Sequence, residues 1–207
     1  SKAPKAVWRG THWFNDVQNH ELRKRLLKIA SGKPWADVET LKWETNSKDA
    51  KNALDIEDFC RYKYIIYTEG VSYSGRLPFH QACRSVVLTT PISWMLHTTH
   101  LVRPVLSSTL LGPGSDMESK LPDSTRRAWP TTFEPDKANM VFVSPDWSDL
   151  EATIQWLEDH PAVAEGIARR QRELFNDRGY LSPAAETCYW RALIKGWNQV
   201  AQPEGEE

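Results

Sequence analysis

The stretch TEGVSYSGRL, residues 68–77, carries the side chains best suited to bind an anion. Glycines let the backbone approach a ligand closely, serine hydroxyls donate to phosphate oxygens, and an arginine adds a fixed charge with two parallel donors. The stretch supplies these groups as Gly70, Ser72, Ser74, Gly75 and Arg76. The pattern therefore predicts a diphosphate site, and a plain strand-to-helix turn with serine caps and a solvated arginine is its alternative.

A second pair of residues is expected at the same place. Arg9 and Gly10 end the strand-like run KAVWRG, residues 5–10. Ligands of parallel sheets collect at the carboxyl ends of the strands, where the following helices present free N–H groups. The glycine spacing fits neither GxGxxG nor GxxxxGK[ST], which argues against an ordinary NAD-binding domain and against a P-loop ATPase.

The composition argues against several classes of binding partner and cofactor. The 207 residues include 26 basic and 27 acidic side chains, so no whole-chain field favours nucleic acid or an anionic membrane. No apolar run approaches the roughly 20 residues that span a bilayer, and SKAPKAVWRG lacks the apolar core of a signal peptide, so we expect a soluble chain. Cys60, Cys83 and Cys188 have no zinc-ligand spacing, and we expect neither a metal nor another cofactor. The thiols are either three free buried groups or one disulfide with an unpaired thiol.

Apolar periodicity predicts strands that alternate with helices. Strand-like runs cover residues 5–10, 62–67, 85–90 and 139–144, and helical spacing covers 22–30 and 76–83. Three more helices are expected in the last third of the chain, the first with a capping box of Ser148 and Glu151. Residues 31–60 are interpreted as a polar surface connection that ends in a short helix.

This alternation indicates an α/β fold with a mostly parallel, Rossmann-like sheet. We predict a single domain over residues 1–201. Prolines and glycines predict an irregular loop around residues 102–138, and residues 202–207 should form a disordered tail.

Five segments together resemble glycosyltransferase family 90, the capsule-associated-protein and protein O-glucosyltransferase family, in its fungal-type branch. They are VWRG (7–10), DFCRYKYIIYTEGVSYSGRL (58–77), CRSVVL (83–88), DWSDL (146–150) and LSPAAETCYWRALIKGW (181–197), and they follow the order found in the family. The resemblance implies the C-terminal, nucleotide-sugar-binding lobe of a GT-B fold. It also implies a UDP-sugar donor of the xylose or glucose type, with inverting transfer to a hydroxyl of a glycan or protein acceptor.

The resemblance assigns roles to the residues of the anion site. Arg9 and Arg76 would hold the diphosphate, while Gly10 and the loop from Glu69 to Arg76, with Gly70, Ser72, Ser74 and Gly75, would shape the donor site. The resemblance also suggests a disulfide between Cys60 and Cys83 and a place in the secretory pathway, in the Golgi or the ER lumen. Cys188 would stay unpaired within this chain.

Two departures from the family keep a second interpretation open. The family's amino-terminal lobe, with the acceptor site and a general base, is not recognisable, so catalytic residues stay unknown and a missing lobe is an expected partner. Ser93 stands before Trp94, where relatives often carry an acidic residue. The alternative is a catalytically inactive α/β nucleotide-binding or interaction module derived from this family.

Overall fold

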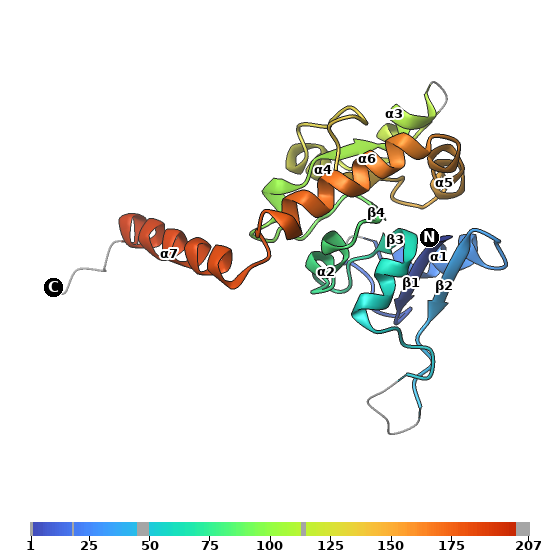
Figure 1. The fold of residues 1–207 in the computed structure, drawn as a ribbon, viewed down its shortest axis with the longest axis horizontal. Coiled ribbons are helices and arrows are strands. Elements are labelled where there is room, and N and C mark those ends of the chain that lie inside the picture. Colours follow the sequence, from blue (N-terminus) through green and yellow to red (C-terminus); the bar gives the residue numbers. More distant parts are fainter. Residues whose placement is uncertain (1, 18, 45–49, 113–114, 202–207) are drawn as a thin grey trace.

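The computed structural model describes residues 2–17, 19–44, 50–112 and 115–201. Its centre is a six-stranded sheet in the order β2-β1-β3-β4-β6-β5, in which every pair of neighbours is parallel (Figure 1). The strands are β1 (Ala3–Gly10), β2 (Ala36–Thr40), β3 (Tyr62–Tyr67), β4 (Val86–Thr89), β5 (Pro104–Leu106) and β6 (Met140–Phe142). The predicted α/β fold with a Rossmann-like parallel sheet is confirmed.

The central strands are apolar along their length because both faces of the sheet are covered. In β3, Tyr64 and Ile66 belong to one core, while Ile65 and Tyr67 belong to the other. Successive side chains of a strand point to opposite faces, so a strand buried on both faces has a continuous apolar run. This is why YKYIIY could be recognised as a strand.

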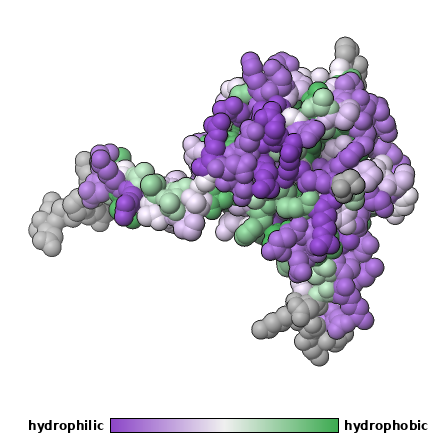
Figure 2. Space-filling model, viewed as in Figure 1, coloured by the Kyte–Doolittle hydropathy of each residue, from purple (hydrophilic) through white to green (hydrophobic). Residues whose placement is uncertain are grey.

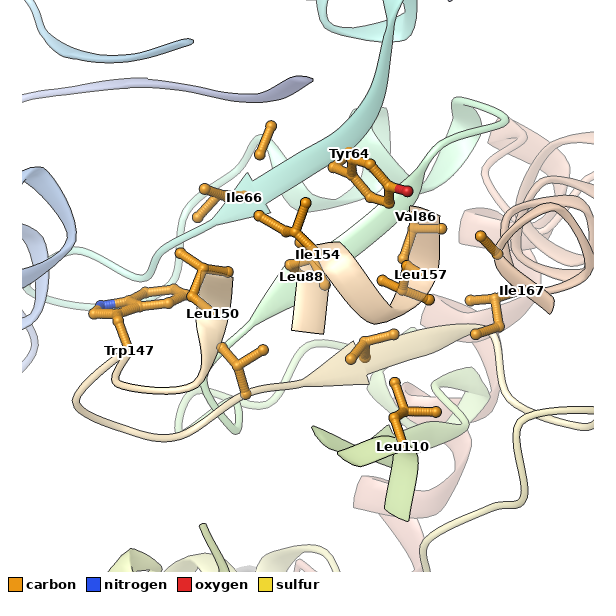
Figure 3. Close-up of a cluster of buried hydrophobic side chains, with 14 of the residues drawn as sticks. Tyr64, Ile66, Val86, Leu88, Leu110, Trp147, Leu150, Ile154, Leu157 and Ile167 are labelled. Carbon is orange, nitrogen blue, oxygen red and sulfur yellow. The ribbon is translucent and has the colours of Figure 1, made fainter. Parts of the chain in front are cut away.

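Helices contribute to both cores. Helices α1 (Leu22–Ala30), α5 (Leu150–Asp159) and α6 (Pro161–Arg172) supply one core, which Figure 3 shows around Ile66, Val86 and Ile154. The second core takes side chains from the 3-10 helix η1 (Ile56–Arg61), from α2 (Leu77–Ala82) and from the π-helical turn η4 (Glu173–Asp177). The predicted capping box is wrong, because the Glu151 carboxylate binds Lys33 at 2.8 Å and Trp35 at 3.0 Å.

The two edges of the sheet differ from the sequence prediction. Strand β2 lies within the segment interpreted as a surface connection, and the expected loop 102–138 contains β5, α3 (Ser107–Leu111), a 3-10 turn η3 (Glu118–Lys120) and α4 (Asp123–Ala128). Every residue of β2 is only half-buried, and β5 is three residues long and begins with Pro104. Short edge strands with polar or proline residues lack the apolar run that identifies a strand.

Helix α7 (Pro183–Val200) extends away from the rest of the molecule (Figure 1). Ser182 caps its start, since the hydroxyl accepts the N–H of Ala185 at 3.2 Å. No residue of α7 is buried, although Leu193 and Trp197 lie on its apolar face. The predicted tail, residues 202–207, lies outside the described residues.

Candidate functional site

The predicted site lies where the order of the sheet reverses. Strand β1 has β2 on one side and β3 on the other, so the connections leave the β1–β3 pair in opposite directions. Ligands of open parallel sheets bind in the crevice outside the carboxyl ends at such a switch point. Gly10 ends β1, and the stretch from Glu69 follows β3 toward α2, which places both predicted segments at this edge.

Tyr67 at the end of β3 fixes the glycine-rich loop. The Ser74 N–H donates to the Tyr67 hydroxyl oxygen at 3.0 Å, and that hydroxyl donates to the Ser74 carbonyl at 3.4 Å. Within the loop the N–H of Gly70 donates to the Ser72 carbonyl at 2.8 Å. Gly75 is exposed, and a Cβ added to it would meet nothing within 4 Å. Packing therefore requires no glycine at position 75.

Arg76 lies at the switch point, as predicted. Its Nη1 donates to the backbone carbonyl of Arg9, and its Nε donates to the Ser74 hydroxyl at 3.4 Å. The side chain is half-buried, and burial lowers the pKa of Arg76 from its usual value. Its charge is therefore partly removed from water.

Arg23 is a second arginine at this edge, and sequence reasoning missed it. It lies on α1, is 5% exposed, and donates from Nη1 to the Thr11 carbonyl at 2.8 Å and from Nε to the Glu69 carbonyl at 3.1 Å. Its guanidinium also lies 5.8 Å from the ring centre of Trp8. Its place in the sequence could have indicated its burial. Arg23 precedes the buried Leu26 and Ala30 by three and seven residues, so it falls on the apolar stripe of the helix.

The two guanidinium groups of Arg23 and Arg76 form a positive site. Among the described residues, no ion pair joins Arg23 or Arg76 to a carboxylate. Burial, together with the charge of Arg76, lowers the pKa of Arg23 to about 10. A cation that is both desolvated and close to another cation favours an incoming anion. We call Arg23 and Arg76 the arginine pair.

Gly70 leaves room for the arginine pair. A Cβ at position 70 would lie 3.3 Å from Nη2 of Arg23, a distance tighter than most real Cβ contacts. At Gly10, a Cβ would lie 2.5 Å from the ring of Trp8, whose indole N–H donates to the Thr68 hydroxyl at 3.0 Å. A side chain at position 10 would therefore collide with Trp8, whereas one at position 70 would press on the Arg23 guanidinium.

The Arg9 side chain is placed differently from the prediction. Its guanidinium donates to the Asp37 carboxylate at 2.7 Å, to the Asp37 carbonyl at 2.8 Å and to the Asn52 carbonyl at 3.1 Å. Alternation along β1 turns Arg9 away from the face that carries Trp8 and Arg23. Arg9 thus contributes its backbone carbonyl to the arginine pair, while its side chain joins β1 to β2.

The Glu69 carboxylate binds the loop after β4 and forms no ion pair with the arginine pair among the described residues. Its carboxylate oxygens accept the backbone N–H groups of Ser93 at 3.0 Å and Trp94 at 2.8 Å. Burial raises the pKa of Glu69 to about 7. The Trp94 indole N–H in turn donates to the Asp16 carboxylate at 3.0 Å. Glu69 therefore ties the loops after β3 and β4 together, and Trp94 joins them to the loop after β1.

These three loops border a cavity of about 580 Å³, which we call the edge cavity. Asn19, Glu69 and Ser93 line it from the loops after β1, β3 and β4, and Asp146 lines it from the loop after β6. Lys120 lines the cavity from the segment after β5. The cavity thus lies at the carboxyl edge of the sheet and is bordered by side chains of both charges.

A disulfide spans the segment that carries the loop. Cys60, before β3, bonds to Cys83, after α2, at a sequence separation of 23, as the family resemblance suggested. Cys188 on α7 is free and exposed. The disulfide thus joins the ends of the strand, loop and helix unit that includes Arg76.

A metal centre and a membrane-spanning helix are both absent from the described residues. No group of three or more histidine, cysteine, aspartate or glutamate side chains is arranged to hold a metal ion within those residues. Across the same residues, no helix combines the length and the apolar character needed to cross a membrane.

Comparisons with known proteins identify the family of this chain. The chain is 23% identical over 203 residues to the O-glucosyltransferase rumi homolog of Anopheles gambiae, a match that covers 97% of this chain and 43% of that protein. It is 22% identical over 156 residues to protein O-glucosyltransferase 1 of Homo sapiens, covering 75% of this chain and 31% of that protein. The chain therefore spans less than half the length of these curated relatives.

The sequence profile of glycosyl transferase family 90 matches residues 1–107, which include the arginine pair and the loop 69–76. This chain is a member of glycosyl transferase family 90.

Proposed function

We propose that this chain is the donor-binding part of a UDP-sugar-dependent glycosyltransferase of GT-B architecture. The donor carries a sugar of the xylose or glucose type, and an acceptor hydroxyl on a glycan or protein displaces UDP with inversion at the anomeric carbon. The family membership supports glycosyl transfer, and the relatives that match are O-glucosyltransferases by name. The identities of the nucleotide and of the sugar are our proposal.

The arginine pair is the observation that carries the proposal. Arg23 and Arg76 both anchor on backbone carbonyls at the end of β1, those of Thr11 and Arg9, so their remaining N–H donors are held at the switch point. Neither group has a carboxylate partner among the described residues. A nucleoside diphosphate supplies the missing negative charge, with bidentate contacts that suit guanidinium groups.

The same pair serves the chemical step that we propose. As the acceptor oxygen attacks the anomeric carbon, the bond between that carbon and the β-phosphate oxygen breaks, and negative charge develops on the departing UDP. Fixed donors that face the developing charge stabilise the transition state more than the ground state. Arg23 and Arg76 are held by hydrogen bonds before the ligand arrives, so little reorganisation is needed.

A second folded body completes the site in this proposal. Most exposed large hydrophobic side chains of the described residues fall in two places, the loops after the strands and the segment from Tyr180 through α7. Trp13, Tyr73 and Trp94 belong to the first group, and Trp197, 70% exposed, belongs to the second. Figure 2 shows apolar colour along α7. We propose that the amino-terminal lobe expected from the family covers these surfaces and supplies the general base.

We further propose that the protein works in the lumen of the secretory pathway, either the ER or the Golgi. The disulfide between Cys60 and Cys83 supports this location, since disulfides persist in oxidising compartments. Tagging the chain in cells and testing its Cys60–Cys83 bond after alkylation, with fractionation of ER and Golgi, would check the location and separate the two compartments.

Isothermal titration of UDP, UMP and pyrophosphate tests the donor site. We expect UDP to bind more tightly than UMP, and Arg76→Met to weaken UDP binding about 10- to 100-fold, because a hydrogen bond to a charged group contributes roughly 1.5–3 kcal/mol. Arg61→Met is the matched control, since the Arg61 side chain is 80% exposed before β3. A folded chain that binds none of the three ligands, or an equal loss in both variants, would refute the proposal.

Mixing the chain with a separately produced amino-terminal lobe of a relative tests turnover. We expect release of UDP from a UDP-sugar only when both parts and an acceptor are present. UDP binding without any turnover in the reconstituted pair would favour the catalytically inactive module.

A further inference from the structure

The edge cavity adjoins the arginine pair through Glu69 and Leu22. The backbone carbonyl of Glu69 accepts a hydrogen bond from Arg23 at 3.1 Å, while Glu69 itself lines the cavity. Leu22, the neighbour of Arg23 on α1, lines it as well. The edge cavity therefore adjoins the place where the arginine pair would hold a diphosphate.

The lining of the edge cavity suits a ring with several hydroxyl groups. Asp146 offers carboxylate acceptors, and Asn19 and Thr125 carry groups that both donate and accept. Each hydroxyl of a sugar ring also donates and accepts. A volume of about 580 Å³ lies within the usual range for small-ligand pockets.

One wall of the cavity belongs to the segment between β5 and β6. Lys120, Pro122 and Thr125 line the cavity from this wall, which follows the residues 1–107 matched by the family profile. Lys120 holds the wall in place, because its ammonium binds the Asp116 and Asp146 carboxylates at 3.0 Å each and the Ser148 hydroxyl at 2.8 Å. The wall is thus joined to the loop after β6.

We propose that the edge cavity binds a polyhydroxyl ring joined to the diphosphate, and that the wall from Lys120 to Thr125 contacts its hydroxyls and determines which ring is accepted. This inference rests on the proposed function. The ring is either the sugar that is transferred or the ribose of the nucleoside, and both present the same chemistry to the cavity.

Two wall variants with matched controls test the inference. Thr125→Val removes one hydroxyl at nearly constant shape, and Lys120→Met removes the charge. Thr131→Val and Lys137→Met are the controls, since both residues are exposed in the same segment and do not line the edge cavity. Affinities of pyrophosphate, UDP and UDP-glucose are measured by titration calorimetry for each variant, and thermal unfolding shows that each is folded.

We expect pyrophosphate binding to stay unchanged in all variants. A sugar in the cavity predicts that both variants weaken UDP-glucose relative to UDP by about 3- to 10-fold, because Thr125→Val removes one hydrogen bond and Lys120→Met releases the wall that carries Thr125. A ribose in the cavity predicts that they weaken UDP relative to pyrophosphate by the same factor. Unchanged ratios in both comparisons, or equal changes in the controls, would overturn the inference alone. Failure of the unmodified chain to bind pyrophosphate and UDP would overturn the proposed function and this inference with it.

Discussion

The hydroxyl of Tyr67 contacts both backbone groups of Ser74, as acceptor of the N–H at 3.0 Å and as donor to the carbonyl at 3.4 Å. Tyr67 is 1% exposed and fixed in the sheet, whereas Ser74 belongs to the loop that leads to Arg76. The side chain of one strand residue therefore determines the backbone position of the residue before the Gly75–Arg76 pair.

Removing this hydroxyl should loosen the loop. We expect Tyr67→Phe to speed amide hydrogen exchange at Ser74 and to weaken UDP binding by about 3- to 10-fold, because a buried N–H loses its acceptor. Tyr180→Phe is the control, since Tyr180 is exposed and far along the chain. Unaltered exchange at Ser74 would show that the loop is held by other contacts.

The two loop glycines should respond differently to alanine. Gly70→Ala places a methyl group against Arg23, so we expect a lower melting temperature and weaker UDP binding as the guanidinium moves. Gly75→Ala meets nothing within 4 Å and should change either property little. Equal effects of the two substitutions would contradict the proposed packing of Arg23 on Gly70.

Glu69 should make stability depend on pH. Burial raises its pKa from 4.5 to about 7, so between these values the unfolded chain releases a proton that the folded chain keeps. The free energy of unfolding then falls as pH rises from about 4.5 to 7, by up to about 3 kcal/mol for this group. Glu69→Gln removes that titration, although it also loses one amide contact and starts from a lower stability. Urea unfolding at pH 5 and pH 8 should show a smaller decrease in the variant, and equal decreases would exclude Glu69 as the titrating group.

Loss of the disulfide should destabilise the unit that carries the loop. We expect the double variant Cys60→Ser and Cys83→Ser to lose about 3 kcal/mol of unfolding free energy, mainly because its unfolded chain is less restricted. Cys188→Ser should leave stability unchanged, since that thiol is free and exposed. Urea titrations with and without reductant would check both, and insensitivity of the unmodified chain to reductant would count against the bond.

The sequence was informative where burial repeats regularly along the chain. The doubly buried strands β3 and β4 and the amphipathic α1 follow from their apolar patterns, and the glycine-rich loop follows from its composition. Strands β2 and β5 were missed because β2 is half polar and β5 has only three residues, so neither forms a recognisable apolar run. Their places in the sheet depend on pairing with distant segments.

Side-chain direction explains the errors at the site. Arg9 and Arg23 have the same chemistry, but alternation along β1 turns Arg9 toward Asp37, while the helical turn of α1 brings Arg23 to Glu69 and Thr11. The direction of Arg9 could have been inferred from the period of the strand. The approach of α1 to the loop 69–76 could not, because it depends on how the helix packs across the sheet.

The arginine pair is anchored almost entirely to main-chain oxygens, those of Arg9, Thr11 and Glu69. A carbonyl is present at every position whatever the side chain, so substitutions at these three positions keep the anchor as long as the backbone keeps its path. The backbone path itself depends on Gly10, where any added methyl group would collide with Trp8. The hold on the two arginines should therefore be insensitive to the side chains at positions 9, 11 and 69, whereas position 10 between the first two should accept almost nothing larger than glycine.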